Sequence, residues 1–148
     1  MPDIHPGEFR FHPDFRTEFA GLDEEVKEEL AATILAVRSI GGPAAGRPYV
    51  DTLKGSKHRN MKELRFHTAT EVWRFAFAYD PTRNAVVLCG GDKQGGSEKE
   101  FYDMLVEKAD KRYDRWIKAV EEAKAKEAGE KRRMANAPGG IKGKGGRK

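Results

Sequence analysis

The densest group of residues able to do chemistry is the segment GSKHRNMKELRF at positions 55–66. With Lys54 it holds five Lys and Arg residues within twelve positions, together with His58 and a single acid, Glu63. A solvated basic loop can have this composition. Closely spaced ammonium, guanidinium and imidazole groups can also bind a phosphodiester, neutralise charge that develops on it, and exchange protons with it. The segment is therefore either a basic surface loop or a phosphate site.

The strand pattern around this segment brings two arginines together. Polar and apolar residues alternate over Glu63–His67, and the aromatic-rich segment Val72–Tyr79 is typical of a central strand. If Thr68–Glu71 forms a four-residue hairpin loop, Arg65 lies directly opposite Arg74 on one sheet face. Like charges in such a pair destabilise a hairpin. Either a phosphate bound by both guanidinium groups neutralises their charge, or each arginine pairs with a carboxylate from the acidic N-terminal helices.

A glycine-rich segment, residues 90–96, follows a third predicted strand, Ala85–Cys89. It is not a phosphate-binding P-loop, because its spacing differs and Lys93 is not followed by Ser or Thr. It is either a plain turn or a means of placing Lys93 near the arginine pair. His5 and His12 lack neighbouring ligands of the types that complete a metal site. The sequence therefore predicts neither a metal site nor a cofactor.

The elements expected to hold these residues begin with a helical hairpin. Apolar residues spaced three or four apart form one helical stripe that is interrupted at Gly21. This pattern predicts a short helix near 13–20 and a longer helix near 24–40. A short strand is expected at Glu8–Phe11. The aromatic side chains on one face of the strand Val72–Tyr79 are expected to pack on the two helices.

Ser97 and Glu100 form a capping box that begins a C-terminal helix, which we expect to reach about Val120. Beyond that point aromatic residues cease, and Lys and Gly become frequent at the end. We therefore predict an α+β domain at 1–120, in which a helical hairpin packs on an antiparallel sheet beside a C-terminal helix. A charged helical extension and a disordered basic tail are expected at 121–148.

Charge is distributed unevenly along the chain. Residues 1–46 contain 4 Lys/Arg and 9 Asp/Glu, residues 47–94 contain 9 and 5, and residues 119–148 contain 9 and 4. The basic middle and end indicate an anionic partner. The single cysteine excludes an intramolecular disulfide framework. No apolar run approaches the roughly 18 residues of a membrane span, and the N-terminus is not a secretory signal, so we expect a cytoplasmic protein without a membrane partner.

Taken together, these segments resemble the RelE/ParE superfamily of type II toxin–antitoxin toxins, and within it the HigB-like, phage-associated branch. The similarity covers roughly residues 8–118. Four anchors occur in the family's order: a Leu-Lys-Gly turn at 53–55, the run Lys-Glu-Leu-Arg at 62–65, Arg74 inside the next strand, and Gly-Asp-Lys at 91–93. The resemblance implies a small RelE-like fold in which two helices cover one sheet face and a patch of cations lies on the other, open face.

The resemblance also implies a chemistry. RelE and HigB members cleave mRNA on the ribosome, whereas ParE members poison DNA gyrase. RNA is cleaved when its 2′-OH attacks the adjacent phosphate, so cations would neutralise the phosphorane while a histidine, or a lysine with a lowered pKa, takes the proton. A late tyrosine used by RelE has its nearest counterpart in Tyr113. Carried over by position, the catalytic residues are Lys57, His58, Arg65, Arg74 and Lys93, and the RNA-binding residues are Lys54, Arg59 and Lys62.

We therefore expect a metal-independent endoribonuclease toxin that acts on ribosome-bound mRNA and is held inactive by a cognate antitoxin of helix-turn-helix type. Two alternatives stay open: a ParE-like gyrase inhibitor without nuclease chemistry, and a non-catalytic nucleic-acid-binding domain. The complete set of cations favours the nuclease. The basic residues of 119–148 are expected to add affinity for ribosomal RNA without sequence preference.

Overall fold

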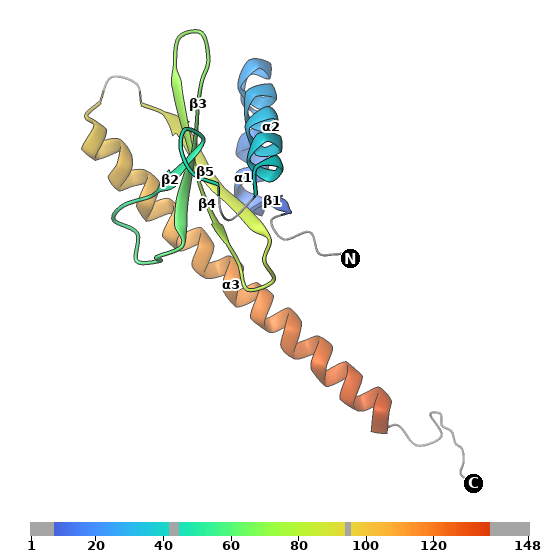
Figure 1. Cartoon of the computed structure of the whole chain (residues 1–148). Coiled ribbons are helices and arrows are strands. Elements are labelled where there is room, and N and C mark those ends of the chain that lie inside the picture. Colours follow the sequence, from blue (N-terminus) through green and yellow to red (C-terminus); the bar gives the residue numbers. More distant parts are fainter. Residues whose placement is uncertain (1–7, 42–44, 94–95, 137–148) are drawn as a thin grey trace. The chain divides into compact units, whose positions relative to one another are not determined.

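A five-stranded sheet forms the centre of the structure, a computed structural model that describes residues 8–41, 45–93 and 96–136 (Figure 1). The strands are β1 (Phe9–Phe11), β2 (Val50–Thr52), β3 (Met61–His67), β4 (Val72–Tyr79) and β5 (Ala85–Asp92). Their order across the sheet is β1-β5-β4-β3-β2. β3, β4 and β5 pair antiparallel as expected, and β2, a strand that the sequence pattern did not predict, pairs antiparallel with β3. β1 runs parallel to β5, so the sheet is mixed. Adjacent parallel strands need a long connection, and here two helices and strands β2 to β4 lie between β1 and β5 in the sequence.

The hairpin of β3 and β4 has the predicted register. The Thr68 N–H donates a hydrogen bond of 2.9 Å to the Glu71 carbonyl, which closes a four-residue loop. Arg65 consequently stands opposite Arg74 in the ladder. The predicted arginine pair is therefore confirmed.

Two helices, α1 (Pro13–Ala20) and α2 (Glu24–Ser39), cover one face of the sheet, with the bounds that the apolar spacing predicts (Figure 1). Between the helices and the sheet lies the hydrophobic core, in which Phe15 of α1 meets Phe75 of β4 at 5.7 Å between ring centroids. Leu64 of β3 is fully buried in the same core. The aromatic face of β4 is thus core, as predicted.

The first part of α3 (Glu98–Asn136) covers the opposite face of the sheet. The Ser97 hydroxyl accepts a hydrogen bond of 3.0 Å from the Glu100 N–H, which caps the start of the helix. Leu105 is buried, and its carbonyl accepts a contact of 3.5 Å from the Cys89 thiol of β5. Because the helix has an apolar side that must be buried, this second face is covered and is not the open face that we expected.

Arg112 fastens α3 to the rest of the fold. Its guanidinium donates hydrogen bonds of 2.9 and 2.6 Å to the two carboxylate oxygens of Glu18 in α1, and one of 2.7 Å to the buried Leu88 carbonyl of β5. The hydrogen bond from Arg112 holds the pKa of Glu18 below its usual value of 4.5. One side chain therefore ties α3 to both α1 and β5.

α3 continues past Val120, where we expected it to end, as far as Asn136. The compact unit that contains the sheet ends at Asp114, and residues from Arg115 onward form a second unit. Nearly all the described side chains after Val120 are exposed. Ala, Glu and Lys, which favour helix, dominate this stretch and explain its helicity without packing. The predicted disordered tail at 137–148 lies outside the described residues.

Candidate active site

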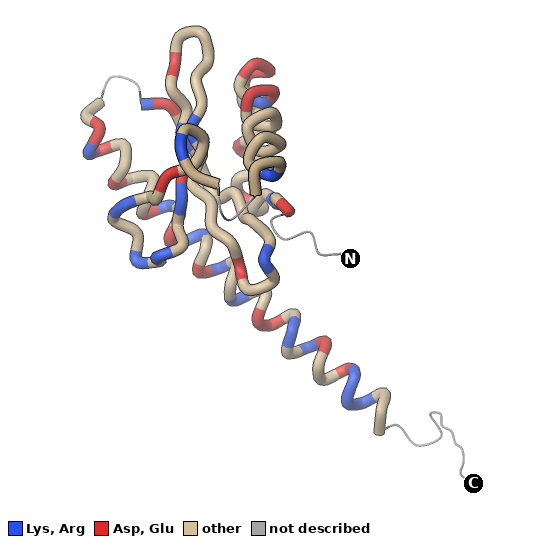
Figure 2. Tube along the Cα trace, in the orientation of Figure 1, with Lys and Arg blue, Asp and Glu red and all other residues tan. Residues whose placement is uncertain are grey.

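The connection between β2 and β3, which we call the cationic loop (residues 54–60), carries half of the predicted site residues: Lys54, Lys57, His58 and Arg59. The buried Leu53 donates its N–H to the Met61 carbonyl at 3.0 Å and closes the base of the loop. Gly55 adopts a left-handed φ of 94°, which side-chain-bearing residues rarely do. Figure 2 shows Lys and Arg gathered on this loop, whereas carboxylates gather on the first turns of α2. The turn at 53–55 thus projects the cations from the sheet.

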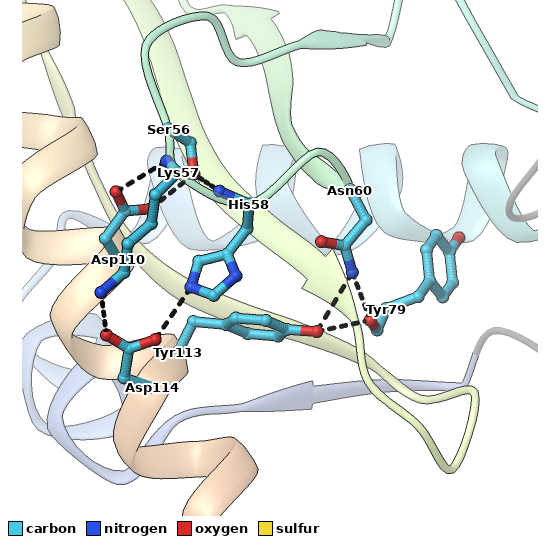
Figure 3. A network of polar contacts seen from close by, with 8 residues as sticks. All are labelled: Ser56, Lys57, His58, Asn60, Tyr79, Asp110, Tyr113 and Asp114. Carbon is cyan, nitrogen blue, oxygen red and sulfur yellow. Dashed lines mark hydrogen bonds and ion pairs between the residues drawn. The ribbon is translucent and has the colours of Figure 1, made fainter.

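Asp110 of α3 holds the backbone of the cationic loop (Figure 3). The Ser56 hydroxyl donates to Asp110 Oδ1 at 2.5 Å, and the Lys57 N–H donates to Asp110 Oδ2 at 3.2 Å. The His58 N–H in turn donates to the Ser56 hydroxyl at 2.9 Å. The Asp110 carboxylate therefore binds Ser56 and Lys57 directly and holds the His58 backbone through the Ser56 hydroxyl.

Asp114, one helical turn further along α3, binds the two functional side chains of the loop. Its Oδ2 lies 2.6 Å from Lys57 Nζ and its Oδ1 lies 2.8 Å from His58 Nε2. The hydrogen bond with Lys57 holds the pKa of the Asp114 carboxyl below its usual range, and the same bond raises the pKa of Lys57. We considered a lysine with a lowered pKa as the base, but Lys57 has the opposite shift.

Tyr113 forms the wall on which His58 rests. The two rings meet edge to face with centroids 4.8 Å apart. The Tyr113 hydroxyl donates to the Tyr79 carbonyl at 2.8 Å and accepts from Asn60 Nδ2 at 3.1 Å (Figure 3). Burial raises the pKa of Tyr113. Its hydroxyl is thus engaged by the fold, and the residue supports the histidine with its ring.

Arg65 belongs to a separate cluster on the α3 side of the sheet. Its Nη2 lies 3.5 Å from the Tyr102 hydroxyl and 3.8 Å from Glu63 Oε2. Tyr102 donates its proton to Glu63 Oε1 at 2.8 Å. The buried Glu63 carboxylate therefore compensates the arginine charge. The Arg65 side chain keeps 41% of its surface exposed, so it can still meet a ligand.

Arg74, the partner of Arg65 across the ladder, is covered by the first turns of α3. Its guanidinium carbon lies 5.7 Å from the centre of the Phe101 ring and 5.5 Å from that of Tyr102, and Glu98 lies 4.0 Å away. Only 11% of its side chain is exposed. Cation–π contacts and a carboxylate thus stabilise the arginine pair. The carboxylates come from β3 and α3, not from the N-terminal helices that we considered as their source.

Comparison with known proteins identifies the family. Residues 17–114 match the family described as "Phage derived protein Gp49-like (DUF891)". The chain belongs to this family. The match ends at the residue that closes the compact unit, Asp114. It therefore includes the cationic loop and the carboxylates of α3 that hold it.

Relatives of this Gp49-like chain carry toxin names. "Putative toxin HigB2" of Mycobacterium tuberculosis (strain ATCC 25618 / H37Rv) is 41% identical over 108 residues, which are 72% of this chain and 52% of that protein. "Putative toxin HigB3" of the same strain is 46% identical over 105 residues, 71% of this chain and 89% of that protein. This chain thus spans about half the length of the first relative. The HigB-like, phage-associated resemblance is confirmed.

Among solved structures, a mutant of the E. coli toxin RelE in the free state aligns with a TM-score of 0.45 at 13% identity. The alignment covers 68% of this chain and 94% of that one.

The Gp49-like fold divides the predicted site into two clusters. Lys57 and His58 lie on the cationic loop, whereas Arg65 lies four residues past the start of β3, about 13 Å along the strand from Met61. Tyr102 and Asp110, which contact the respective clusters, are eight residues or about 12 Å apart along α3. The residues predicted as one patch therefore form two separate clusters, and each cluster contacts a different part of α3.

Four other predicted residues lie at the margins of these clusters. Strand alternation directs Lys62 to the face of Leu64, opposite to that of Arg65, so Lys62 does not join the arginine cluster. Lys93 is exposed just past the end of β5. Lys54 and Arg59 are exposed on the cationic loop. Of the cations assigned to RNA binding, Lys54 and Arg59 thus lie on the same loop as His58.

An open groove of about 570 Å³ adjoins the arginine cluster at the edge of the sheet. Its lining comes from α2, from the segment before β2 and from β3, and comprises Glu29, Thr33, Arg47, Pro48, Tyr49, Val50, Asp51, Arg65, Phe66 and His67. Arg65 is the predicted site residue that reaches this groove.

The sequence interpretation missed the α3 residues that organise both clusters: Tyr102, Asp110 and Asp114. Part of the signal was present in the sequence, because Asp110 and Asp114 are four positions apart and so lie on one helix face. Within the described ranges no group of three or more His, Cys, Asp and Glu could hold a metal ion. No described helix is long and apolar enough to cross a membrane.

Proposed function

We propose that this protein is the toxin of a type II toxin–antitoxin module and that it cleaves mRNA on the ribosome. The observation that carries the proposal is the cationic loop, on which Lys57 and His58 are held at fixed positions by two carboxylates of α3. The toxin names of two relatives support it. A basic loop that was merely exposed to solvent would not need three of its residues bound to a helix.

The proposed reaction is attack of an RNA 2′-OH on the adjacent phosphate. Lys57 is a cation that can neutralise charge on the phosphorane, and the His58 imidazole can accept the proton of the 2′-OH. Lys54 and Arg59 supply further positive charge on the loop for the RNA backbone. Arg65 can bind a neighbouring phosphate at the edge of the groove, while the covered Arg74 adds positive charge from the next strand.

The test is induction of the chain alone in a bacterial host, with pulse labelling of protein and DNA. We expect protein synthesis to stop first and mRNA to be cut within translated regions. If Arg65 stabilises the transition state, Arg65→Ala should lower the cleavage rate by about 10²–10³-fold. The growth arrest should then be relieved. Arrest of DNA synthesis while translation continues would refute the proposal in favour of gyrase inhibition. Binding of RNA without cleavage would instead favour a nucleic-acid-binding domain.

The proposal includes a cognate antitoxin, which we expect to be a helix-turn-helix protein encoded nearby. An uncovered cluster of loop cations would bind RNA without specificity, so an acidic or mixed-charge partner is expected to cover or distort it. Co-expression with the adjacent open reading frame should give a complex that survives size exclusion at moderate salt and restores growth. A genome with no such neighbour would count against the module.

A further inference from the structure

We infer that His58 is the general base through its Nδ1 atom and that Asp114 is the residue that positions it. This inference rests on the proposed nuclease function and assigns a role within it. The structure supports it through three contacts to one histidine. Its backbone is bound to Ser56, its Nε2 to Asp114, and the edge of its ring lies against Tyr113.

The contact with Asp114 determines which ring nitrogen carries the proton. An ionised carboxylate can only accept hydrogen bonds, so the nitrogen at 2.8 Å, Nε2, must donate its hydrogen. Asp114 is ionised at neutral pH because the bond from Lys57 holds its pKa low. In the neutral imidazole the lone pair then lies on Nδ1, the nitrogen that is directed away from the carboxylate.

The charged and titratable groups around His58 come from two elements. The cationic loop contributes Lys57 beside it, and α3 contributes Asp110, Tyr113 and Asp114. Lys57 and His58 occupy different oxygens of the same carboxylate (Figure 3). Because Asp114 raises the pKa of Lys57, the lysine remains an ammonium ion and cannot be the base.

In the assigned step Nδ1 of His58 takes the proton of the RNA 2′-OH. The 2′-oxygen forms a bond to phosphorus, the bond from phosphorus to the 5′-oxygen breaks, and the leaving 5′-oxygen takes a proton from water. The products are a 2′,3′-cyclic phosphate and a 5′-hydroxyl. Asp114 never touches the RNA, and its negative charge stabilises the imidazolium that forms.

The test compares five full-length proteins: wild type, Asp114→Asn, His58→Gln, the double variant of these two, and Asp103→Asn. Asp103 is the matched control, because it lies on α3, is exposed, and pairs with Lys99 away from the loop. Cleavage of ribosome-bound mRNA is measured at saturating and at limiting ribosomes. Imidazole ¹⁵N spectra report which nitrogen of His58 carries the proton, with His58→Gln identifying its signals among those of the four histidines.

We expect His58→Gln to lower the maximal rate by about 10²–10³-fold and Asp114→Asn by about 10–10²-fold, with KM changed less than about twofold. The double variant should be no slower than His58→Gln alone, because Asp114 acts through His58. Asp103→Asn should match wild type. In the wild-type spectrum at mildly alkaline pH, Nε2 should carry the proton.

Two results would overturn the assignment. One is an Asp114→Asn loss that is as large in the His58→Gln background as in wild type, since that would show that Asp114 acts through Lys57 or the fold and not through His58. The other is a wild-type spectrum with the proton on Nδ1. If wild type cut no RNA, the proposed function and the base role would both fail, while the spectrum would still decide whether the His58–Asp114 pair exists.

Discussion

Replacing Arg112 by methionine is expected to destabilise the compact unit by about 3 kcal/mol. Only 10% of the Arg112 side chain is exposed, and it makes two hydrogen bonds to Glu18 and one to the Leu88 carbonyl. Breaking a buried ion pair typically costs about 3–5 kcal/mol. Glu18 is 42% exposed, so water recovers part of that loss. The Leu88 carbonyl stays buried without its donor, which costs about 1–3 kcal/mol.

Urea unfolding of the full chain measures this loss. Methionine keeps much of the side-chain volume, so the change reports mainly the polar contacts. With a dependence of about 1–3 kcal/mol per molar urea, the midpoint should fall by roughly 1–3 M. Arg16→Met, at an exposed position of α1, is the control and should change stability by less than about 0.5 kcal/mol. If the two variants unfold at the same urea concentration, Arg112 does not fasten α3 as argued.

Four further predictions follow from burial, charge and packing. The ion pair with Arg112 lowers the pKa of Glu18 in the folded protein, so it stabilises the fold above pH 4.5 and this stabilisation is lost as the pH falls through the lowered pKa. The melting temperatures of Glu18→Gln and wild type should therefore converge on acidification below pH 4.5. Gly90→Ala should cost about 1–3 kcal/mol in urea unfolding, because its Cβ would lie 2.1 Å from the fully buried Phe75 ring. Burial raises the pKa of Cys89 to about 12, so a thiol reagent at about pH 8 should label it only in denaturant. Deleting 121–148 should leave the melting temperature nearly unchanged but weaken ribosome binding and flatten its salt dependence.

The arginine pair could be predicted from the sequence because local features determine it. Alternation defined the strand faces, and the four residues of Thr68–Glu71 set which positions stand opposite each other. The same alternation excludes Lys62 from the face of Arg65. The family resemblance assigned Lys62 by its place in the sequence and did not take its strand face into account.

The support of the cationic loop could not be predicted in the same way. Asp110 lies 54 positions from Ser56, and Asp114 lies 56 positions from His58. Such contacts depend on how a helix is rotated when it docks on a sheet, and that rotation is decided by packing over the whole face. An apolar stripe showed that α3 has a buried side, but not that this side would cover Arg74.

The pairing of β1 with β5 also bears on when the protein can become active during its own synthesis. Phe9 stands beside Ala85, and the Glu18–Arg112 contact spans 94 positions. Contacts so distant in sequence cannot form until their later partner has been made, and closing such long loops slows folding. A ribosome must therefore synthesise almost all of the compact unit before the site can assemble. For a protein proposed to cleave mRNA during translation, the ribosome can therefore translate nearly all of the protein's own mRNA before the active site forms.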